Sequence, residues 1–218
     1  DKNNTWGYLN DLWMYDPVTN LWTWVSGSDL VNQPGFFGEQ CVSSPSNIPC
    51  SRYENRARWT DTCGNFWMFG GRKDAHGSLN DLWMYDSTIT SSSPWAWKSG
   101  GNLTATKGNC NQTSSSLPSA PQTTASTTPG GRGNRPASFA AHDPVTGAST
   151  TVNMLAVFGG YGHACVGSVG FLNDLWLYHA TPAGTAYSGQ WTWASGSSTV
   201  NNAGVYYGYP YQYNNPAA

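Results

Sequence analysis

The sequence LNDLWMYD occupies residues 9–16, and the same eight residues recur at 79–86. A near copy, LNDLWLYH, occupies residues 172–179. An identical octamer containing Trp, Met and Tyr does not arise twice by chance in a chain of 218 residues. The chain therefore contains an internal repeat, which indicates a fold built from similar units.

Short strand-like segments surround each octamer. A segment with the pattern Trp-x-Trp follows each copy, at residues 21–25, 95–97 and 191–193. This spacing places both indoles on one face of a strand. An apolar segment ending in Phe-Gly-Gly precedes the second and third copies, at 66–71 and 154–160. Helical periodicity is absent throughout, so we expect an all-β protein.

These segments define a unit of four strands. The first strand is expected near Ala57–Thr60, with Ser138–Ala141 as its counterpart, and an arginine opens each copy, Arg52 in one and Arg135 in the other. The second strand ends in Phe-Gly-Gly, the third is the octamer and the fourth is Trp-x-Trp. The stretch 61–65, DTCGN, has the composition of a turn between the first two strands.

The pattern resembles the Kelch repeat, one four-stranded blade of a β-propeller, in the form found in secreted proteins with galactose-oxidase-like central domains. The resemblance implies a single propeller segment over 1–218 with a half blade at 8–25 and full blades at 52–98 and 135–194. Residues 26–51, 99–134 and 196–218 would be inter-blade loops. The residues expected to maintain the blades are Asn10, Asp11, Trp13, Trp22, Trp24, Arg52, Gly70, Gly71, Asn80, Asp81, Trp83, Trp95, Trp97, Arg135, Gly159, Gly160, Asn173, Asp174, Trp176, Trp191 and Trp193.

About two and a half blades do not close a propeller, which needs roughly four to eight. We therefore expect part of a larger or multi-chain propeller, with remaining blades or other subunits as protein partners. An open arc would leave apolar sheet faces exposed at its ends. The tyrosine-rich stretch 206–213 is either an inter-blade loop or an interface for assembly.

The meander topology of a blade places Cys41, Cys50, Cys110 and Cys165 on one face of the disc and Cys63 on the other. We therefore predict the disulfides Cys41–Cys50 and Cys110–Cys165, with Cys63 unpaired. Oxidised cysteines indicate an extracellular protein.

The composition supports the same location. Net charge is −2, which gives no electrostatic case for binding nucleic acid, and no apolar run is long enough for a transmembrane helix. N-glycosylation sequons begin at Asn3, Asn102 and Asn111. The Ser/Thr/Pro-rich stretch 113–131 is typical of O-glycosylated segments, or of a flexible linker in a cytosolic protein. We expect a secreted or cell-surface glycoprotein.

The sequence predicts no catalytic residue, metal ligand or cofactor. No Ser/His/Asp triad, phosphate loop or pair of glycosidase carboxylates is recognisable, and Asp16 and Asp86 are expected to be turn residues. His76 and His163 follow Gly-Gly pairs in equivalent loops, where they could approach a metal.

The predicted function is an interaction or structural module that binds protein or glycan partners, including an extracellular assembly or filament. The alternative is the propeller of a secreted copper-radical oxidase like galactose oxidase. Such an enzyme needs two Tyr, two His and a Cys–Tyr crosslink, a set that the sequence does not allow us to assign.

Overall fold

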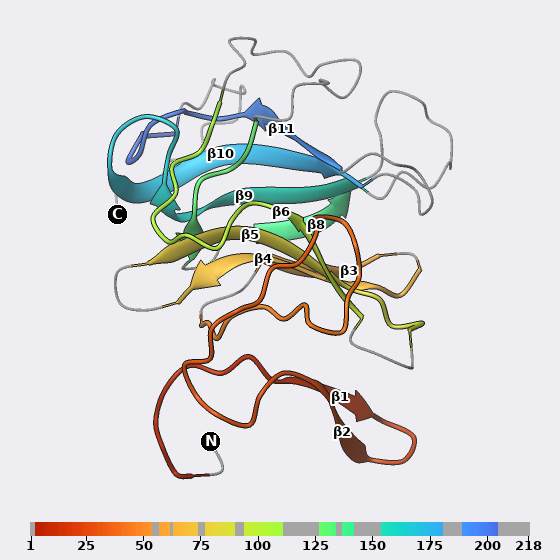
Figure 1. The fold of residues 1–218 in the computed structure, drawn as a ribbon. Coiled ribbons are helices and arrows are strands. Elements are labelled where there is room, and N and C mark those ends of the chain that lie inside the picture. The colour runs from red at the N-terminus through yellow and green to blue at the C-terminus, as the bar shows by residue number, and fades with distance from the viewer. Residues whose placement is uncertain are drawn as a thin grey trace, which may run out of the picture.

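The computed structural model describes residues 3–53, 57–61, 63–73, 77–89, 94–110, 127–133, 137–141, 154–180 and 189–204. The described residues form strands and no helix, which confirms the predicted all-β class (Figure 1). Within this part of the chain, accordingly, no helix is long and apolar enough to cross a membrane. The strands are β1 (Leu12–Asp16), β2 (Leu21–Ser26), β3 (Ala57–Thr60), β4 (Phe66–Arg72), β5 (Ser78–Tyr85), β6 (Trp95–Ser99), β7 (Arg132–Gly133), β8 (Ala137–Ala141), β9 (Met154–His163), β10 (Val169–His179) and β11 (Gln190–Ser195).

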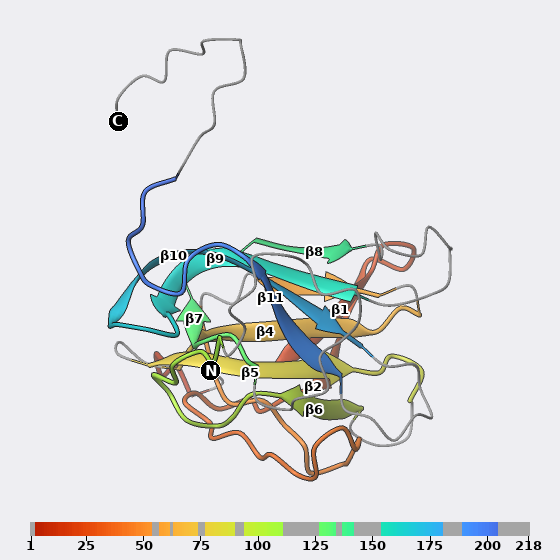
Figure 2. The ribbon, with the colours of Figure 1, turned by 90° about the horizontal axis from the view of Figure 1, so that it is seen from above.

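Three antiparallel sheets follow one another along the chain, and we name them units. The first unit is the hairpin β1–β2, the second is the sheet β3–β4–β5–β6, and the third contains β7 to β11 in the order β11–β10–β9 with β7 and β8 both on β9. The second unit lies between the other two, and the first unit is at the opposite end of the molecule from β10 and β11 (Figure 1). Seen from above, the strands of successive units overlie one another (Figure 2).

The strands lie close to the predicted positions. The first strand of the second unit matches Ala57–Thr60, and its counterpart in the third unit lies within Ala137–Ala141. The second strands differ, because they continue through the double glycine instead of ending there. Gly70 has a φ of +66°, and a Cβ at this residue would lie 2.7 Å from the carbonyl oxygen of Arg132. Glycine is therefore needed here so that the next unit can approach the strand.

Apolar side chains fill the space between neighbouring units. Between the second and third units, Phe69 packs edge-on against Trp191 with ring centroids 5.0 Å apart, and the Trp191 indole donates to Ser99 Oγ (3.1 Å). Between the first and second units, Leu12 packs on the buried cluster that contains Trp83. Burial between units, rather than within one sheet, thus provides the core.

A narrow neck closes the long segment between the second and third units. Asn109 and Thr128 are joined by two backbone hydrogen bonds of 2.8 and 3.2 Å. Directly beyond this bridge, Cys110 is bonded to Cys165 in the turn between β9 and β10. The two ends of the segment are therefore held together at the surface of the third unit.

Candidate interaction surface

Each unit carries the same four aromatic side chains on one face. In the first unit Trp13 lies directly opposite Trp24, and Tyr15 lies opposite Trp22. Directly opposed residues of an antiparallel pair point to the same side of the sheet. The equivalent sets are Trp83, Tyr85, Trp95 and Trp97 in the second unit, and Trp176, Tyr178, Trp191 and Trp193 in the third.

The neighbouring unit covers three members of this set in the third unit, and the fourth, Trp193, is half-buried. Trp176, Tyr178 and Trp191 are at most 3% exposed. Tyr178 packs against Trp67 with ring centroids 6.0 Å apart, and Trp191 packs against Phe69. Burial raises the pKa of the Tyr178 hydroxyl strongly above its usual range, so this tyrosine stays protonated.

In the second unit a loop covers much of this set, and Tyr85 and Trp97 are half-buried. Phe37 lies 4.8 Å from Trp83 and 5.4 Å from Trp97, measured between ring centroids. The Trp95 indole donates to Ser26 Oγ at 2.9 Å, at the end of β2. Trp83 and Trp95 are 0% and 3% exposed as a result.

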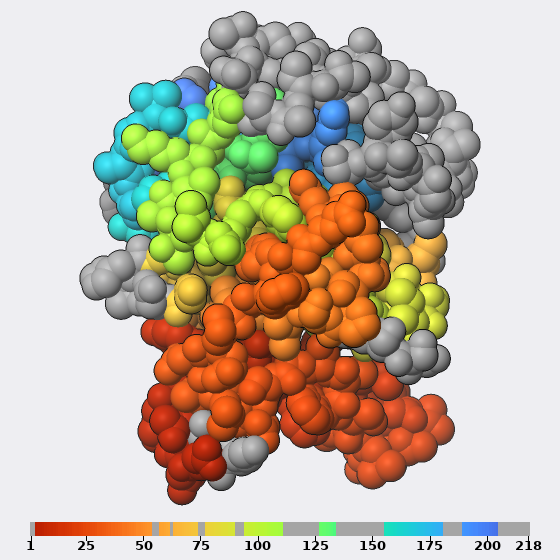
Figure 3. Space-filling view, viewed as in Figure 1, coloured from red at the N-terminus to blue at the C-terminus, as the bar shows by residue number. Residues whose placement is uncertain are grey.

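The same set in the first unit is exposed to solvent. Trp13, Tyr15, Trp22 and Trp24 are 50%, 43%, 65% and 53% exposed. We name these four side chains the aromatic face. In the space-filling view the first unit forms a separate lobe at the end of the molecule (Figure 3).

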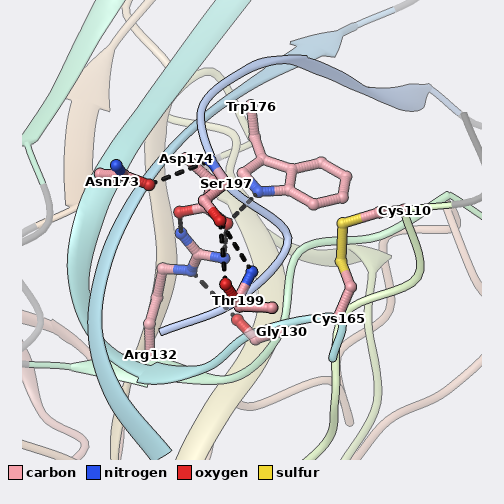
Figure 4. Close-up of a disulfide and its surroundings, with 9 residues drawn as sticks. All are labelled: Cys110, Gly130, Arg132, Cys165, Asn173, Asp174, Trp176, Ser197 and Thr199. Carbon is pink, nitrogen blue, oxygen red and sulfur yellow. Dashed lines mark hydrogen bonds and ion pairs between the residues drawn. A yellow bond between two sulfur atoms is a disulfide. The ribbon is translucent and has the colours of Figure 1, made fainter. Parts of the chain in front are cut away.

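A buried arginine–aspartate pair fixes the start of the octamer strand in the second and third units. Arg52 donates to both carboxylate oxygens of Asp81, each at 2.7 Å. Arg132 does the same to Asp174, at 2.7 and 2.9 Å (Figure 4). The carboxylate also accepts the indole N–H two residues later, from Trp83 or Trp176. The two ions are thus paired and satisfied by further hydrogen bonds, as burial of charge requires.

Each arginine also binds backbone carbonyls next to it. Arg52 donates to the oxygens of Cys50 and Gly70, and Arg132 to those of Gly130 and Gly159. Burial opposes the charge on Arg52, but the Asp81 carboxylate outweighs this effect, and the pKa of the guanidinium is raised. Arg52 therefore stays charged, and each arginine links the segment that precedes the first strand to the second and third strands of its unit.

The prediction that Arg135 is the counterpart of Arg52 is wrong, because Arg132 holds the aspartate of the third unit. Arg135 itself lies outside the described residues. A sequence signal was available, since Arg52 and Arg132 each stand three residues after a proline, Pro49 or Pro129. Each also stands five residues before the first strand of its unit.

The first unit has the aspartate without the arginine. Asp11 is half-buried, and its Oδ2 accepts the indole N–H of Trp13 at 2.8 Å, as in the other units. Among the described residues no arginine pairs with Asp11.

The three asparagines expected to maintain the blades hydrogen-bond to the backbone of the connecting segments. Asn10 accepts from the Ser28 amide and donates to the Pro49 carbonyl at 3.1 Å. Asn80 makes equivalent bonds to the Gly101 amide and the Pro129 carbonyl, and Asn173 accepts from the Ser197 amide. These bonds tie the end of each unit to its third strand.

The cysteine predictions are confirmed in one case and wrong in another. The structure contains Cys110–Cys165, with Cα atoms 5.8 Å apart (Figure 4). Cys41 and Cys50 are separate thiols. Cys41 is held on the second unit, where its amide donates to the Trp97 carbonyl, whereas the Cys50 sulfur accepts from Arg52. Burial raises the pKa of both thiols. Cys63 is an exposed free thiol.

The remaining predicted residues give no second site. Asp16 and Asp86 cap turns, as expected, by accepting the amides of Val18 and Thr88. In the described ranges no three His, Cys, Asp or Glu side chains are grouped to hold a metal ion. The glycosylation sites stay predictions, with Asn3 and Asn102 exposed. Asn111, His76, residues 113–126 and the stretch 206–213 lie outside the described residues.

Comparison with known proteins adds no relative. No protein-family model matches the chain, and no curated protein sequence matches it.

Proposed function

We propose that the protein is an interaction module of the Kelch-propeller type, which binds a protein partner through the aromatic face of its first unit. One observation carries this proposal. All four aromatic residues are exposed in the first unit, whereas the equivalent residues in the second and third units are buried or half-buried.

The composition of the first unit supports a protein interface. Trp and Tyr are the residues most enriched at the centre of such interfaces, and charged residues are depleted there. Residues 12–26 contain Asp16 as their single charged residue. A contiguous exposed apolar surface of this kind marks an interaction site.

The structure also suggests the chemistry of the partner surface. In the third unit the covering surface consists of apolar side chains, among them Trp67 and Phe69, together with the Ser99 hydroxyl. Trp22 occupies the position of Trp191, and within the described part of the chain no acceptor receives its indole N–H. A partner that matches the aromatic face would present apolar side chains and a hydrogen-bond acceptor close to Trp22.

The proposed setting is extracellular. A disulfide that closes 55 residues of sequence separation persists in oxidising compartments, so it is compatible with secretion. The partner is then a second extracellular protein, or further subunits of an extracellular assembly.

The test compares two tryptophans that are both exposed. Proteins from the extracellular medium that bind the wild-type chain are identified, and each is purified. Affinities are then measured for wild type, Trp22→Ser and Trp6→Ser. Trp6 is 97% exposed and lies outside β1 and β2, so it controls for the loss of an exposed indole.

The proposal expects Trp22→Ser to weaken binding about 30-fold or more, as for a residue at the centre of an interface. Trp6→Ser should leave the affinity unchanged. Equal affinities for all three proteins would contradict the proposal. The proposal would also be contradicted if no protein partner required Trp22 for binding while binding to immobilised glycans did require it.

A further inference from the structure

The outer edge of β1 differs from the equivalent edges in the other units. In the second unit β5 pairs with β4 on one side and β6 on the other, and in the third β10 pairs with β9 and β11. β1 pairs with β2, and among the described strands no second neighbour lies on its other side. A strand edge of this kind is a template for pairing with another polypeptide.

Asp11 immediately precedes β1 and occupies the position of Asp81 and Asp174, the aspartates that pair with arginine in the other two units. In the second unit, Oδ2 of Asp81 accepts both the Trp83 indole at 2.8 Å and the Arg52 guanidinium at 2.7 Å. Oδ2 of Asp11 already accepts the Trp13 indole, so the carboxylate is oriented in the same way. The Oδ1 atom, which in Asp81 receives the second Arg52 nitrogen at 2.7 Å, has no such donor within the described part of the chain.

We propose that the open edge of β1 binds an arginine-bearing β-hairpin of a partner polypeptide, whose arginine forms a bidentate pair with Asp11. The hairpin is of the type found twice in this chain, in which an arginine is followed by two strands and the second contains Phe-Gly-Gly. This inference rests on the proposed function, because it names how the partner of the first unit is held.

The pairing in the second unit predicts the register. There Phe66 lies opposite Tyr85, and Met68 lies opposite Trp83. An apolar residue of the partner strand should thus lie opposite Trp13, and an aromatic residue opposite Tyr15. A second copy of this chain cannot supply the hairpin from its described residues, because β3–β4 and β8–β9 already pair with β5 and β10.

The test uses a synthetic peptide with the sequence of residues 49–72, labelled with fluorescein and with both cysteines replaced by serine. It is titrated against the 218-residue chain and followed by fluorescence anisotropy. Asp11→Asn removes the negative charge but keeps an oxygen that can accept the Trp13 indole, so it is the matched variant. The second arm uses a peptide in which the residue equivalent to Arg52 is glutamine.

The proposal expects either change to weaken binding about tenfold or more, as for a charge-assisted bidentate pair. Combining Asp11→Asn with the glutamine peptide should weaken binding little more than either change alone. Hydrogen exchange on the bound wild-type chain should show slower exchange of the β1 amides, which packing on the aromatic face alone would not produce. Near-ultraviolet circular dichroism confirms that Asp11→Asn is folded.

Three outcomes would overturn the inference. The first is equal binding of both peptides, and the second is binding without protection of β1. The third is no peptide binding together with self-association that Trp22→Ser abolishes and Asp11→Asn does not. In that last case a second copy covers the aromatic face, so the proposed function stands while the proposed hairpin is excluded.

Discussion

The hairpin β1–β2 of the first unit and the hairpin β10–β11 of the third contain nearly the same residues in different surroundings. The rings of Tyr15 and Trp22 lie 5.1 Å apart, and those of Tyr178 and Trp191 also lie 5.1 Å apart. The strand register and the spacing of these two rings are therefore the same in both hairpins, although the angle between the rings is 41° in the first and 56° in the third. Exposure differs greatly, since Trp22 is 65% exposed and Trp191 is 3% exposed. The repeat sequence determines the shape of a unit, and the neighbouring unit determines how much that shape contributes to stability.

The largest expected difference between the two hairpins is in the free energy of unfolding when the tryptophan of the octamer strand, Trp176 or Trp13, is replaced by alanine. Trp176 is fully buried, so Trp176→Ala should lower the free energy of unfolding by about 3–5 kcal/mol. Trp13→Ala, at a residue that is half exposed, should cost less than about 1.5 kcal/mol. Urea unfolding followed by circular dichroism measures both. Equal losses would mean that Trp13 is buried in solution.

The second test compares the two aspartates. Asp174→Asn leaves the buried Arg132 without its counterion, and we expect a loss of about 3 kcal/mol. Asp11→Asn, where no described arginine is left unpaired, should change stability by less than about 1 kcal/mol. The same unfolding measurement applies. A large loss for Asp11→Asn would show that a cation already binds this carboxylate.

A third test concerns the disulfide Cys110–Cys165. Among the described residues, no equivalent disulfide is attached to the first or second unit. Cys165→Ser should lower the free energy of unfolding by about 2–3 kcal/mol, because the unfolded chain regains the freedom of a long loop. Cys63→Ser, at an exposed free thiol, is the matched control and should have no measurable effect. Peptide mapping without reduction should find Cys110–Cys165 and no bridge between Cys41 and Cys50.

The smallest expected effect is a pH dependence from His163. Burial, and to a smaller extent Lys107, lowers the pKa of this histidine in the folded chain. The folded state then binds the proton more weakly than the unfolded state. The stability from the neutral form is present above the ordinary histidine pKa of about 6.5 and falls as the pH drops below it. Unfolding curves of wild type and His163→Gln between about pH 7 and 5 should therefore diverge modestly, with wild type losing more stability.

The strands and the turns were predictable from the sequence because their signals are local. Alternation of Trp and Tyr with apolar residues fixes which side chains share a face, and Asp61 followed by Gly64 forms the expected turn. Each repeated asparagine accepts an amide from the segment that follows the fourth strand of its own unit, whereas the bonds of Asn10 and Asn80 to Pro49 and Pro129 reach the start of the next unit.

The features that the sequence did not reveal depend on neighbouring units. Arg132 was missed because Arg135 stands closer in the sequence to the first strand of the third unit. The arginine that reaches Asp174 is selected instead by the path of the chain, which brings Arg132 within hydrogen-bond distance of the Gly159 carbonyl. The Cys41–Cys50 pairing failed because the loop places Cys41 beside Trp97. Gly70 was taken as a strand end, yet its role is to admit the carbonyl of Arg132.

The neck formed by Asn109, Thr128 and the adjoining disulfide has a consequence for protein engineering. Since two backbone hydrogen bonds and a covalent bond hold the ends of this segment, its length does not set the position of the third unit. Doubling the length of such a closed loop costs only about 0.6 kcal/mol of additional closure entropy. A foreign peptide inserted between the two ends of the neck, Cys110 and Thr128, should therefore change the free energy of unfolding little. The neck therefore makes this segment a suitable site for insertions.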